Sequence, residues 1–185
     1  ADGSANQQLR KIKRGVEKES LRTTNNGFIA ITPHPEALGS ALTHPSITTD
    51  FSEALLEFIT AAYNNISDLL DELDDIHRFV HAQIGEELLW VNSMPCQIKA
   101  DTEIPIANFG RSNVGKMKHI YRLGLGHRYG RSMQTIAGIH YNFSVPDSIW
   151  QLIASSKRSG LSLKDIKTEG YFDLIRNFRR SAWLL

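Results

Sequence analysis

The chain has 185 residues, a formal net charge of +1 and a charged fraction of 22%. This length allows one sizeable domain with a hydrophobic core, and the balanced charge excludes a strongly basic nucleic-acid-binding protein. No apolar run approaches the ~20 residues of a membrane span, so we expect neither a membrane nor a nucleic acid as a partner. The single Cys96 cannot form an internal disulfide, which favours a reducing, cytoplasmic location.

The two ends of the chain lack the signals of natural termini. Residues 1–8 are polar and have no signal-peptide pattern, and we expect them to be flexible or disordered. Residues 181–185 stop within an apolar run that has no Gly, Asn or Pro to end a helix. We therefore expect a fragment in which residues 9–185 form part of a larger domain that continues after Leu185.

Residues 15–32 predict a β-hairpin with two acidic side chains on one face. The first strand precedes an Asn-Gly turn at residues 26–27, and residues 28–32 form the return strand. Glu17 and Glu19 are two residues apart, so they share one face of the strand. Two such carboxylates repel one another unless water screens them or a cation neutralises them. The pattern fits an ordinary solvated face, or half of a Mg²⁺ site, since Mg²⁺ takes oxygen ligands.

Residues 48–60 fit two alternatives. Asp50 followed by Glu53 is a capping-box pattern that predicts the start of a helix, whereas residues 56–60 fit a strand equally well. In both cases Glu57 is surrounded in sequence by leucine, phenylalanine and isoleucine. Burying an ionised carboxylate alone is costly, so Glu57 lies at an edge or has a charged partner. This favours a ligand or catalytic carboxylate about as strongly as a surface residue.

Two helices follow from apolar residues that recur with helical spacing. The first covers residues 65–84, with Asn65 as its N-cap. His77 and His81 lie one turn apart on it, but no third metal ligand is evident, which favours an ordinary surface pair. The second helix covers residues 116–129. Its inward side chains are expected to be Met117, Ile120, Tyr121 and Leu125.

The segment Gly110–Lys116 nearly matches the phosphate-binding pattern GxxxxGK[ST]. However, Met117 stands where a hydroxyl group would hold Mg²⁺, and Pro105 and Asn108 interrupt the hydrophobic strand that should precede the loop. A P-loop-like nucleotide-binding module is therefore an alternative interpretation. A glycine-rich helix start with weak affinity for anions fits the sequence better.

Residues 133–145 alternate between two kinds of side chain, which predicts a strand with an apolar face on a core. The second face carries Gln134, Ile136, Gly138, His140, Asn142 and Ser144. Its polar groups are short and mostly uncharged, unlike those of an ordinary solvated face, so we expect it to form one wall of a site. A short helix from Ile149 and an apolar-rich helix over residues 169–185 complete the chain.

Several motifs together indicate one protein family. They are the segments Arg14–Glu19, His34–His44, Ile47–Thr60, Ser93–Cys96, Tyr121–Leu125, Arg128–Gln134 and Gly138–Ser144. In combination they resemble bacterial glutamate–cysteine ligase of the proteobacterial type, also called γ-glutamylcysteine synthetase. The resemblance covers nearly the whole chain from about Leu9.

The resemblance implies an α+β fold like the catalytic domain of glutamine synthetase, with a curved antiparallel sheet and helices packed on one face. It implies a ligase that uses ATP to join the γ-carboxyl group of L-glutamate to L-cysteine through γ-glutamyl phosphate, the first step of glutathione biosynthesis. Divalent metal ions, Mg²⁺ or alternatively Mn²⁺, would reduce the repulsion between the phosphates of ATP and the substrate carboxylate. L-Glutamate, L-cysteine and ATP are then the partners.

The resemblance also implies roles for particular residues. The expected metal ligands are Glu17, Glu19, Asp50, Glu57 and His140. The expected substrate-binding residues, on the cysteine side, are Tyr121, Gln134 and Ile136. Glu53 matches the motif as well, but we do not expect it to contact a metal.

The chains of this family are much longer, and their later part supplies a further metal carboxylate and other residues for the substrates and ATP. We therefore expect residues 1–185 alone to be inactive. A non-catalytic α+β fragment that needs the rest of the enzyme remains an alternative interpretation beside the P-loop-like module.

Overall fold

The computed structural model describes residues 3–157 and 160–184. The chain forms two compact units. The larger unit is continuous, Arg14–Asn142, and the smaller unit combines Ala1–Lys13 with Phe143–Leu185. The sequence predicts a single partial domain over residues 9–185 and gives no indication of this division.

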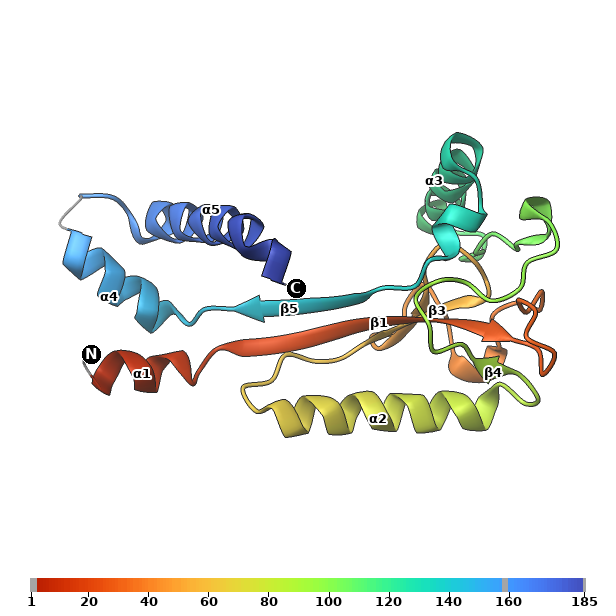
Figure 1. The fold of residues 1–185 in the computed structure, drawn as a ribbon, viewed down its shortest axis with the longest axis horizontal. Coiled ribbons are helices and arrows are strands. Elements are labelled where there is room, and N and C mark those ends of the chain that lie inside the picture. The colour runs from red at the N-terminus through yellow and green to blue at the C-terminus, as the bar shows by residue number, and fades with distance from the viewer. Residues whose placement is uncertain (1–2, 158–159, 185) are drawn as a thin grey trace. The chain divides into compact units, whose positions relative to one another are not determined.

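The larger unit is built around a five-stranded sheet in which the longest strand is β1, Lys13–Thr23. The strand order is β2–β3–β1–β4, and β5 also pairs with β1 (Figure 1). The bounds are Ile47–Thr49 for β2, Leu55–Ile59 for β3, Leu88–Leu89 for β4 and Ile139–Ser144 for β5. β1 pairs antiparallel with β3 and β4, and β2 pairs antiparallel with β3. An antiparallel sheet with helices confirms the predicted α+β class.

The register between β1 and β3 decides which side chains share a face of the sheet. Glu19 pairs directly with Glu57, and Leu21 pairs with Leu55. Directly opposed residues of an antiparallel pair point to the same side, and residues two apart in a strand do so as well. Glu17, Glu19 and Glu57 therefore lie on one face, which we call the carboxylate face.

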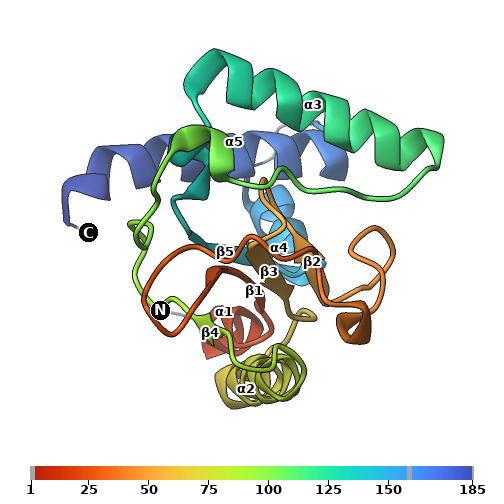
Figure 2. The same ribbon diagram turned by 90° about the vertical axis from the view of Figure 1, so that its right-hand side faces the viewer.

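Helix α2, Ile66–Gln83, covers the opposite face of these strands (Figures 1 and 2). The side chain of Asn65 caps it by accepting a hydrogen bond from the Ser67 amide at 3.0 Å. The helix and its N-cap confirm the prediction from the sequence. Its apolar stripe packs against the strands in a buried cluster made of Leu38, Ile47, Leu56, Phe58, Ile76, Val80 and Ile84.

A second buried cluster lies on the carboxylate face, at the end of the strands marked by Leu21 and Leu55. It includes Cys96, which is 7% exposed. Burial raises the pKa of the Cys96 thiol, since the thiolate is poorly solvated there. Cys96 is therefore a buried thiol of low reactivity.

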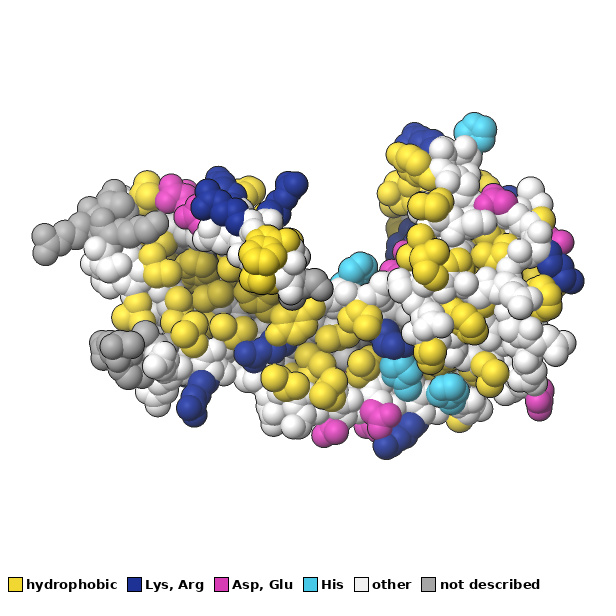
Figure 3. Space-filling view, viewed as in Figure 1, with side chains coloured by type: hydrophobic (Ala, Val, Ile, Leu, Met, Phe, Trp, Pro, Cys, Tyr) yellow, Lys and Arg dark blue, Asp and Glu magenta, His cyan; other side chains and the backbone are white. Residues whose placement is uncertain are grey.

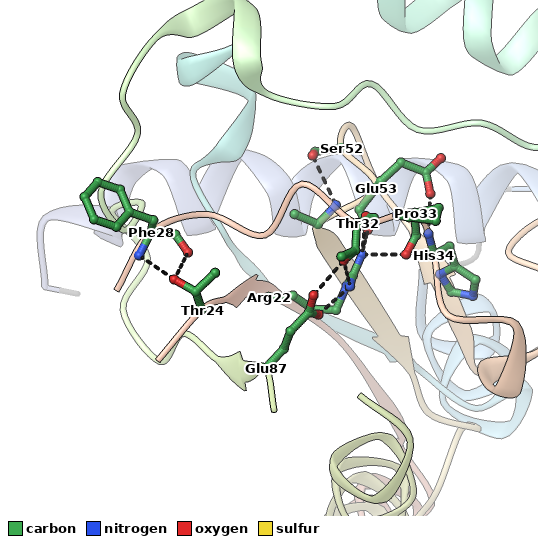
Figure 4. Close-up of polar contacts among 10 residues, drawn as sticks. Arg22, Thr24, Phe28, Thr32, Pro33, His34, Ser52, Glu53 and Glu87 are labelled. Atoms are coloured by element: carbon green, nitrogen blue, oxygen red, sulfur yellow. Dashed lines mark hydrogen bonds and ion pairs between the residues drawn. The ribbon is translucent and has the colours of Figure 1, made fainter. Parts of the chain in front are cut away.

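The guanidinium group of Arg22 is buried, with 1% of the residue exposed, and is surrounded by acceptors (Figure 4). It donates hydrogen bonds to Glu87 Oε2 at 2.5 Å and to Thr32 Oγ1 at 2.7 Å. It also donates to the carbonyl oxygens of Thr32, Pro33 and Glu53 at 2.9–3.0 Å. Its charge is therefore paired inside the protein, and the network ties β1 to the loops around it.

Helix α3, Asn113–Tyr129, lies on the other side of the strands from α2 (Figure 2). The Ser112 side chain caps it by accepting from the Gly115 amide at 3.1 Å. Gly115 packs so closely on the preceding loop that an added Cβ would overlap the carbonyl group of Phe109. The helix begins a few residues earlier than the sequence predicts.

The predicted inward orientation of α3 is largely wrong. Met117, Ile120 and Tyr121 are 62–65% exposed, and hydrophobic side chains show at the surface of this helix in Figure 3. Only Leu125 packs against a core cluster as expected. Polar contacts hold the helix instead, including the ring Nδ1 of His119, which lies 2.8 Å from the Ala107 carbonyl oxygen. The helical spacing of apolar residues in a sequence predicts an apolar stripe on the helix, but it does not predict which element packs against that stripe.

Three further predictions differ from the structure. Residues 28–32 turn back onto the end of β1 as predicted, with Ile29 opposite Thr23 and the Ala30 amide donating to the Arg22 carbonyl at 2.9 Å, but they form isolated bridges and not a full return strand. The chain does turn at Gly27, whose φ is +78°. No helix starts at Asp50, because this residue lies in the tight turn that joins β2 to β3.

The third difference concerns the strand predicted over residues 133–145. Its first part is a 3₁₀ turn, η3 (Ser132–Thr135), and β5 begins only at Ile139. The side chains of β5 that should face a core are exposed: Ile139 by 68%, Tyr141 by 60% and Phe143 by 42%. Two other short 3₁₀ turns are η1, Glu36–Leu38, and η2, Asp101–Glu103.

The smaller unit is helical. It contains α1 (Gly3–Leu9), α4 (Asp147–Lys157) and α5 (Leu163–Ser181), and the turn η4 (Ala182–Leu184) follows α5. The helix α1 includes residues 3–8 of the segment that the sequence predicts to be flexible or disordered, and it packs on α4, whereas residues 1 and 2 lie outside the described residues. Both later helices confirm the elements predicted from residues 149 and 169, although each begins earlier. Among the described residues, no helix combines the length and apolar character needed to cross a membrane.

Trp150 joins the two longer helices of the smaller unit. Its ring is 5% exposed and lies 5.0 Å from the ring of Tyr171, measured between centroids. Gly170 allows this approach, because a Cβ at that position would overlap the indole ring. The hydroxyl oxygen of Tyr171 accepts a hydrogen bond from the Val145 amide at 3.0 Å, and Lys167 pairs with Asp147.

Candidate functional site

The carboxylate face gathers acidic side chains from different parts of the sequence. Glu17 and Glu19 come from β1, and Glu57 comes from β3, where the register sets it directly opposite Glu19. Asp50 comes from the turn between β2 and β3. The predicted pairing of Glu17 and Glu19 on one strand face is therefore correct, and the strand alternative for Glu57 is the one that the structure adopts.

The strand β5 adds a histidine and an amide to this cluster. The ring Nδ1 of His140 lies 3.2 Å from Glu17 Oε2, and the Asn142 side chain donates to Glu17 Oε1 at 2.7 Å. The amide of Gly138 donates to Glu19 Oε2 at 2.7 Å, and the Glu19 amide donates to the Gly138 carbonyl at 3.0 Å. The face of residues 133–145 that carries His140 and Asn142 therefore does form one wall of an acidic cluster.

Two carboxylates of this cluster, Glu57 and Glu19, have raised pKa values. Burial first, and then the neighbouring charges of Asp50, Glu19 and Glu17, together raise the pKa of Glu57 to about 7. Burial also raises the pKa of Glu19, against the hydrogen bond from Gly138. Such shifts arise where like charges are held together without a cation to neutralise them, and they are common at functional sites.

The geometry of three of these residues fits a divalent metal ion. Glu17, Glu57 and His140 each offer one ligand atom, and these atoms all lie within 4.8 Å of one another. Ligand atoms on opposite sides of a Mg²⁺ or Mn²⁺ ion, each ~2.1 Å from it, would be ~4.2 Å apart, so little movement is needed to close the shell. Carboxylate oxygens and an imidazole are also a suitable donor set for these ions.

The other two predicted metal ligands lie beside this group of three. Glu19 is held by the Gly138 amide, and its charge acts on Glu57. Asp50 also raises the pKa of Glu57, and one of its carboxylate oxygens, Oδ1, lies 3.9 Å from Nη2 of Arg122. The structure thus gathers all five predicted residues in one region, and their role as ligands remains a prediction.

The predicted substrate-binding residues are arranged around the same unit. Tyr121 lies on α3 and is 62% exposed, Gln134 lies in η3, and Ile136 lies in the extended segment before β5. Their role in binding cysteine is a prediction that the geometry alone does not test.

Several residues considered from the sequence have other roles. Glu53 is 7% exposed, and its carboxylate accepts hydrogen bonds from the backbone amides of His34 and Asn108, which agrees with the expectation that it does not bind a metal. The ring of His77 packs edge-on against Phe58, with Nδ1 2.7 Å from the Leu73 carbonyl, rather than joining His81.

The P-loop alternative is not supported by the local structure. The segment 104–110 before the loop contains no strand, only an isolated bridge between Ile106 and Ser52. A P-loop requires a strand that leads directly into the phosphate-binding turn. The segment Gly110–Lys116 is instead a capped helix start with Gly110 at a φ of +83°.

Two residues near the cluster are missed by reasoning from the sequence. Asn142 holds Glu17, and its spacing of two residues from His140 was a usable signal, because alternate residues of a strand share a face. Arg122 contacts Asp50 from a helix that lies 72 residues further along the chain. The sequence shows only that Arg122 belongs to a basic segment.

The sequence profile of the glutamate–cysteine ligase family matches residues 1–185. The chain belongs to the glutamate–cysteine ligase family. The glutamate–cysteine ligase of Alcanivorax borkumensis is 58% identical over 185 residues, which are 100% of this chain and 35% of that protein. That of Saccharophagus degradans is 56% identical over 177 residues, which are 96% of this chain and 33% of that protein.

Solved structures of related enzymes have the same fold as this glutamate–cysteine ligase family member. The crystal structure of glutamate–cysteine ligase from Francisella tularensis, in complex with AMP, has a TM-score of 0.87 and 43% identity, and the match covers 95% of this chain and 34% of that one. A bifunctional glutathione synthetase from Pasteurella multocida has a TM-score of 0.89 and 31% identity, over 98% of this chain and 23% of that one. The chain spans about a third of the length of the curated relatives it matches.

Proposed function

We propose that this chain supplies the metal-binding part of the active site of an ATP-dependent glutamate–cysteine ligase. The observation that carries the proposal is the cluster of Glu17, Glu57 and His140, whose ligand atoms lie within 4.8 Å of one another in a member of this family. Glu19 and Asp50 would complete the set of metal ligands. The cytoplasm remains the location that the sequence predicts.

The proposed reaction has two steps. An oxygen of the glutamate γ-carboxylate attacks the γ-phosphorus of ATP, the bond to ADP breaks, and γ-glutamyl phosphate forms. The amine of cysteine then attacks the activated carbonyl carbon, a C–N bond forms, phosphate leaves and the amine loses one proton. A bound Mg²⁺ or Mn²⁺ ion supplies positive charge that offsets the repulsion between the triphosphate and the carboxylate.

The side chains of this chain would prepare the site before the reaction. Asn142 orients Glu17 through a hydrogen bond of 2.7 Å, and the Gly138 amide orients Glu19 in the same way. The raised pKa of Glu57 indicates that the cluster gains stability when a cation replaces its proton. Tyr121, Gln134 and Ile136 would hold the cysteine substrate.

Metal binding can be measured on the 185-residue chain itself. Mn²⁺ is added to the purified chain, and the loss of the free-ion EPR signal reports the bound fraction. We expect saturable binding that Glu17→Gln weakens by ~100-fold, because the substitution removes a ligand. The matched control is Glu86→Gln at an exposed position, which should leave the affinity unchanged. Equal binding by the wild type and Glu17→Gln would contradict the proposed site.

The ligase activity can be measured in a chimera in which this chain replaces the matching third of the Alcanivorax borkumensis enzyme. The chimera should release phosphate from ATP only when L-glutamate and L-cysteine are both present. His140→Ala should reduce turnover by ~100-fold or more, since it removes a metal ligand. Turnover that is independent of cysteine, or unaffected by His140→Ala, would contradict the proposed reaction.

A further inference from the structure

The guanidinium group of Arg122 connects helix α3 to the turn that carries Asp50. Its Nε donates a hydrogen bond to the backbone carbonyl of Asp50, and its Nη2 lies 3.9 Å from Asp50 Oδ1. Its Nη1 donates to the carbonyl of Lys118 at 3.1 Å, one turn earlier on α3. The side chain of Arg122 is 13% exposed, compared with 44% for that of Asp50.

An aromatic ring fixes the orientation of this guanidinium group. The Arg122 guanidinium carbon lies 4.6 Å from the centroid of the Phe109 ring, and Phe109 is itself 5% exposed. Arginine stacks on aromatic faces through its planar guanidinium, which limits the orientations of its donors. The carbonyl of Lys118, the ring of Phe109 and the backbone of Asp50 therefore restrain Arg122 on three sides.

Asp50 needs such a restraint because of its position in the chain. It lies in the turn after β2, outside the sheet ladder that fixes Glu17, Glu19 and Glu57. Its carboxylate has the same charge as those of Glu17, Glu19 and Glu57, which it therefore repels. Without an opposing cation, the Asp50 side chain would have a lower free energy if it turned away from the cluster.

We propose that Arg122 is a positioning residue for the metal site, holding Asp50 toward the carboxylate cluster and linking that cluster to the helix that carries Tyr121. This inference rests on the proposed function, because it takes Asp50 as a metal ligand. Pairing of Oδ1 with Arg122 leaves the second carboxylate oxygen of Asp50 for the metal. The exposed Tyr121 is the neighbour of Arg122 on α3, so the same contact sets the position of a predicted substrate-binding residue relative to the metal.

A purely structural role for Arg122 makes a different prediction. If Arg122 only anchors α3, its removal lowers the stability of the chain and leaves the metal affinity of the folded fraction unchanged. If Arg122 positions Asp50, its removal weakens metal binding in protein that is still folded, and the effect disappears when Asp50 can no longer act as a ligand.

The test measures Mn²⁺ affinity by EPR on the 185-residue chain, with thermal unfolding followed by circular dichroism for each variant. Arg122→Met, which keeps the apolar stem over Phe109, should weaken binding by ~10–100-fold, the usual cost of losing a residue that orients a ligand. Arg122→Lys keeps the charge but not the planar donors, and should weaken binding by ~3–10-fold. The matched control Arg78→Met removes an arginine that is 73% exposed on α2, and should leave the affinity unchanged.

A double-mutant cycle decides whether Arg122 acts through Asp50. Asp50→Asn together with Arg122→Met should bind Mn²⁺ no more weakly than Asp50→Asn alone, because the second change removes support for a ligand that is already lost. The proposal would be overturned if the double variant bound Mn²⁺ more weakly than Asp50→Asn by the full factor seen for Arg122→Met alone. Wild-type affinity in Arg122→Met would also overturn it. Should Arg122→Met not fold, Arg122→Lys with wild-type affinity would overturn it as well. Failure of the proposed metal site itself is recognised separately, since Glu17→Gln would then bind Mn²⁺ as the wild type does.

Discussion

Arg22 and Glu57 lie on paired strands of one sheet, and both carry an ionisable group that is withdrawn from water, completely for Arg22 and about halfway for Glu57. Arg22 is surrounded by Glu87, Thr32 and three carbonyl oxygens, so its charge is neutralised within the protein. Glu57 faces another carboxylate, Glu19, directly across the strand pair. The protein therefore neutralises the charge of Arg22, which stabilises the fold, with its own groups. It leaves the negative charge of the carboxylate cluster for a bound ligand to neutralise.

The largest effect should come from breaking the paired charge. Arg22→Met leaves Glu87 and several buried carbonyl groups without their donor, so the free energy of unfolding should fall by about 3–5 kcal/mol. Urea unfolding of the chain followed by circular dichroism measures this. Arg78→Met, at an exposed ion pair, is the matched control and should change stability by less than about 0.5 kcal/mol. If Arg22→Met lowers the free energy of unfolding by less than ~1 kcal/mol, the pairing of Arg22 does not stabilise the fold, and the proposed difference between Arg22 and Glu57 is wrong.

A smaller effect, in which substitution raises the free energy of unfolding at neutral pH, should come from Glu57. The pKa of Glu57 is about 7 in the folded chain, above its ordinary value of 4.5. The folded state therefore binds this proton more tightly than the unfolded state, and the free energy of unfolding falls as the pH rises from 4.5 to about 7. Linkage sets an upper limit of about 3 kcal/mol for this loss, and solvent screening should reduce it to about 1–2 kcal/mol.

Glu57→Gln removes this pH dependence. The difference in the free energy of unfolding between Glu57→Gln and the wild type should shift in favour of the variant by about 1–2 kcal/mol between pH 5 and pH 8. Urea unfolding in the presence of a chelator measures this difference at each pH. Saturating Mn²⁺ should reverse the order at pH 8, because it stabilises only the chain that binds it. A stability difference that does not change with pH would mean that Glu57 is not held against like charges.

The smallest effect is expected on the face of β1 that α2 covers. Lys18 is half-buried there, its Nζ donates to Ser20 Oγ at 2.5 Å, and burial lowers its pKa. Its long side chain covers apolar surface with the ammonium at the edge, so Lys18→Met should change the free energy of unfolding by no more than about 0.5 kcal/mol. The same urea titration at pH 7 measures this. If Lys18→Met lowers the free energy of unfolding by more than ~1.5 kcal/mol, the charge of Lys18 also stabilises this face of the sheet.

The sequence predicts elements well where a local pattern decides the structure. The apolar spacing of residues 65–84 and the cap at Asn65 give α2 nearly as observed. The alternation around Glu17 and Glu19 gives β1 and the face on which both carboxylates lie. These are periodic signals within one segment, and they need no knowledge of the partner element.

Prediction fails where the partner of a segment decides the structure. The Asn-Gly turn at residues 26–27 does bring Ile29 back to Thr23, but only as an isolated bridge, and the long partner of β1 is Leu55–Ile59. The stripe that includes Ile120 suggested burial, yet that side chain is 65% exposed. The metal cluster follows from family resemblance, and spacing alone indicated only Glu17 and Glu19 as neighbours. Asn142 lies on the strand face that the sequence predicts as a wall of the site, whereas Arg122 reaches the cluster through a tertiary contact that has no local signature in the sequence.

Glu53, whose buried carboxylate is occupied by two backbone amides, has a consequence for the order in which the chain assembles. Its carboxylate receives the backbone amides of His34 and Asn108, which lie 19 and 55 residues away. It thereby closes two large loops in a chain whose single cysteine offers no covalent cross-link. Closing loops of this size costs conformational entropy, and the hydrogen bonds to Glu53 help to offset it. Because such non-local contacts form only after the closure cost is met, we expect the two loops to order late in folding.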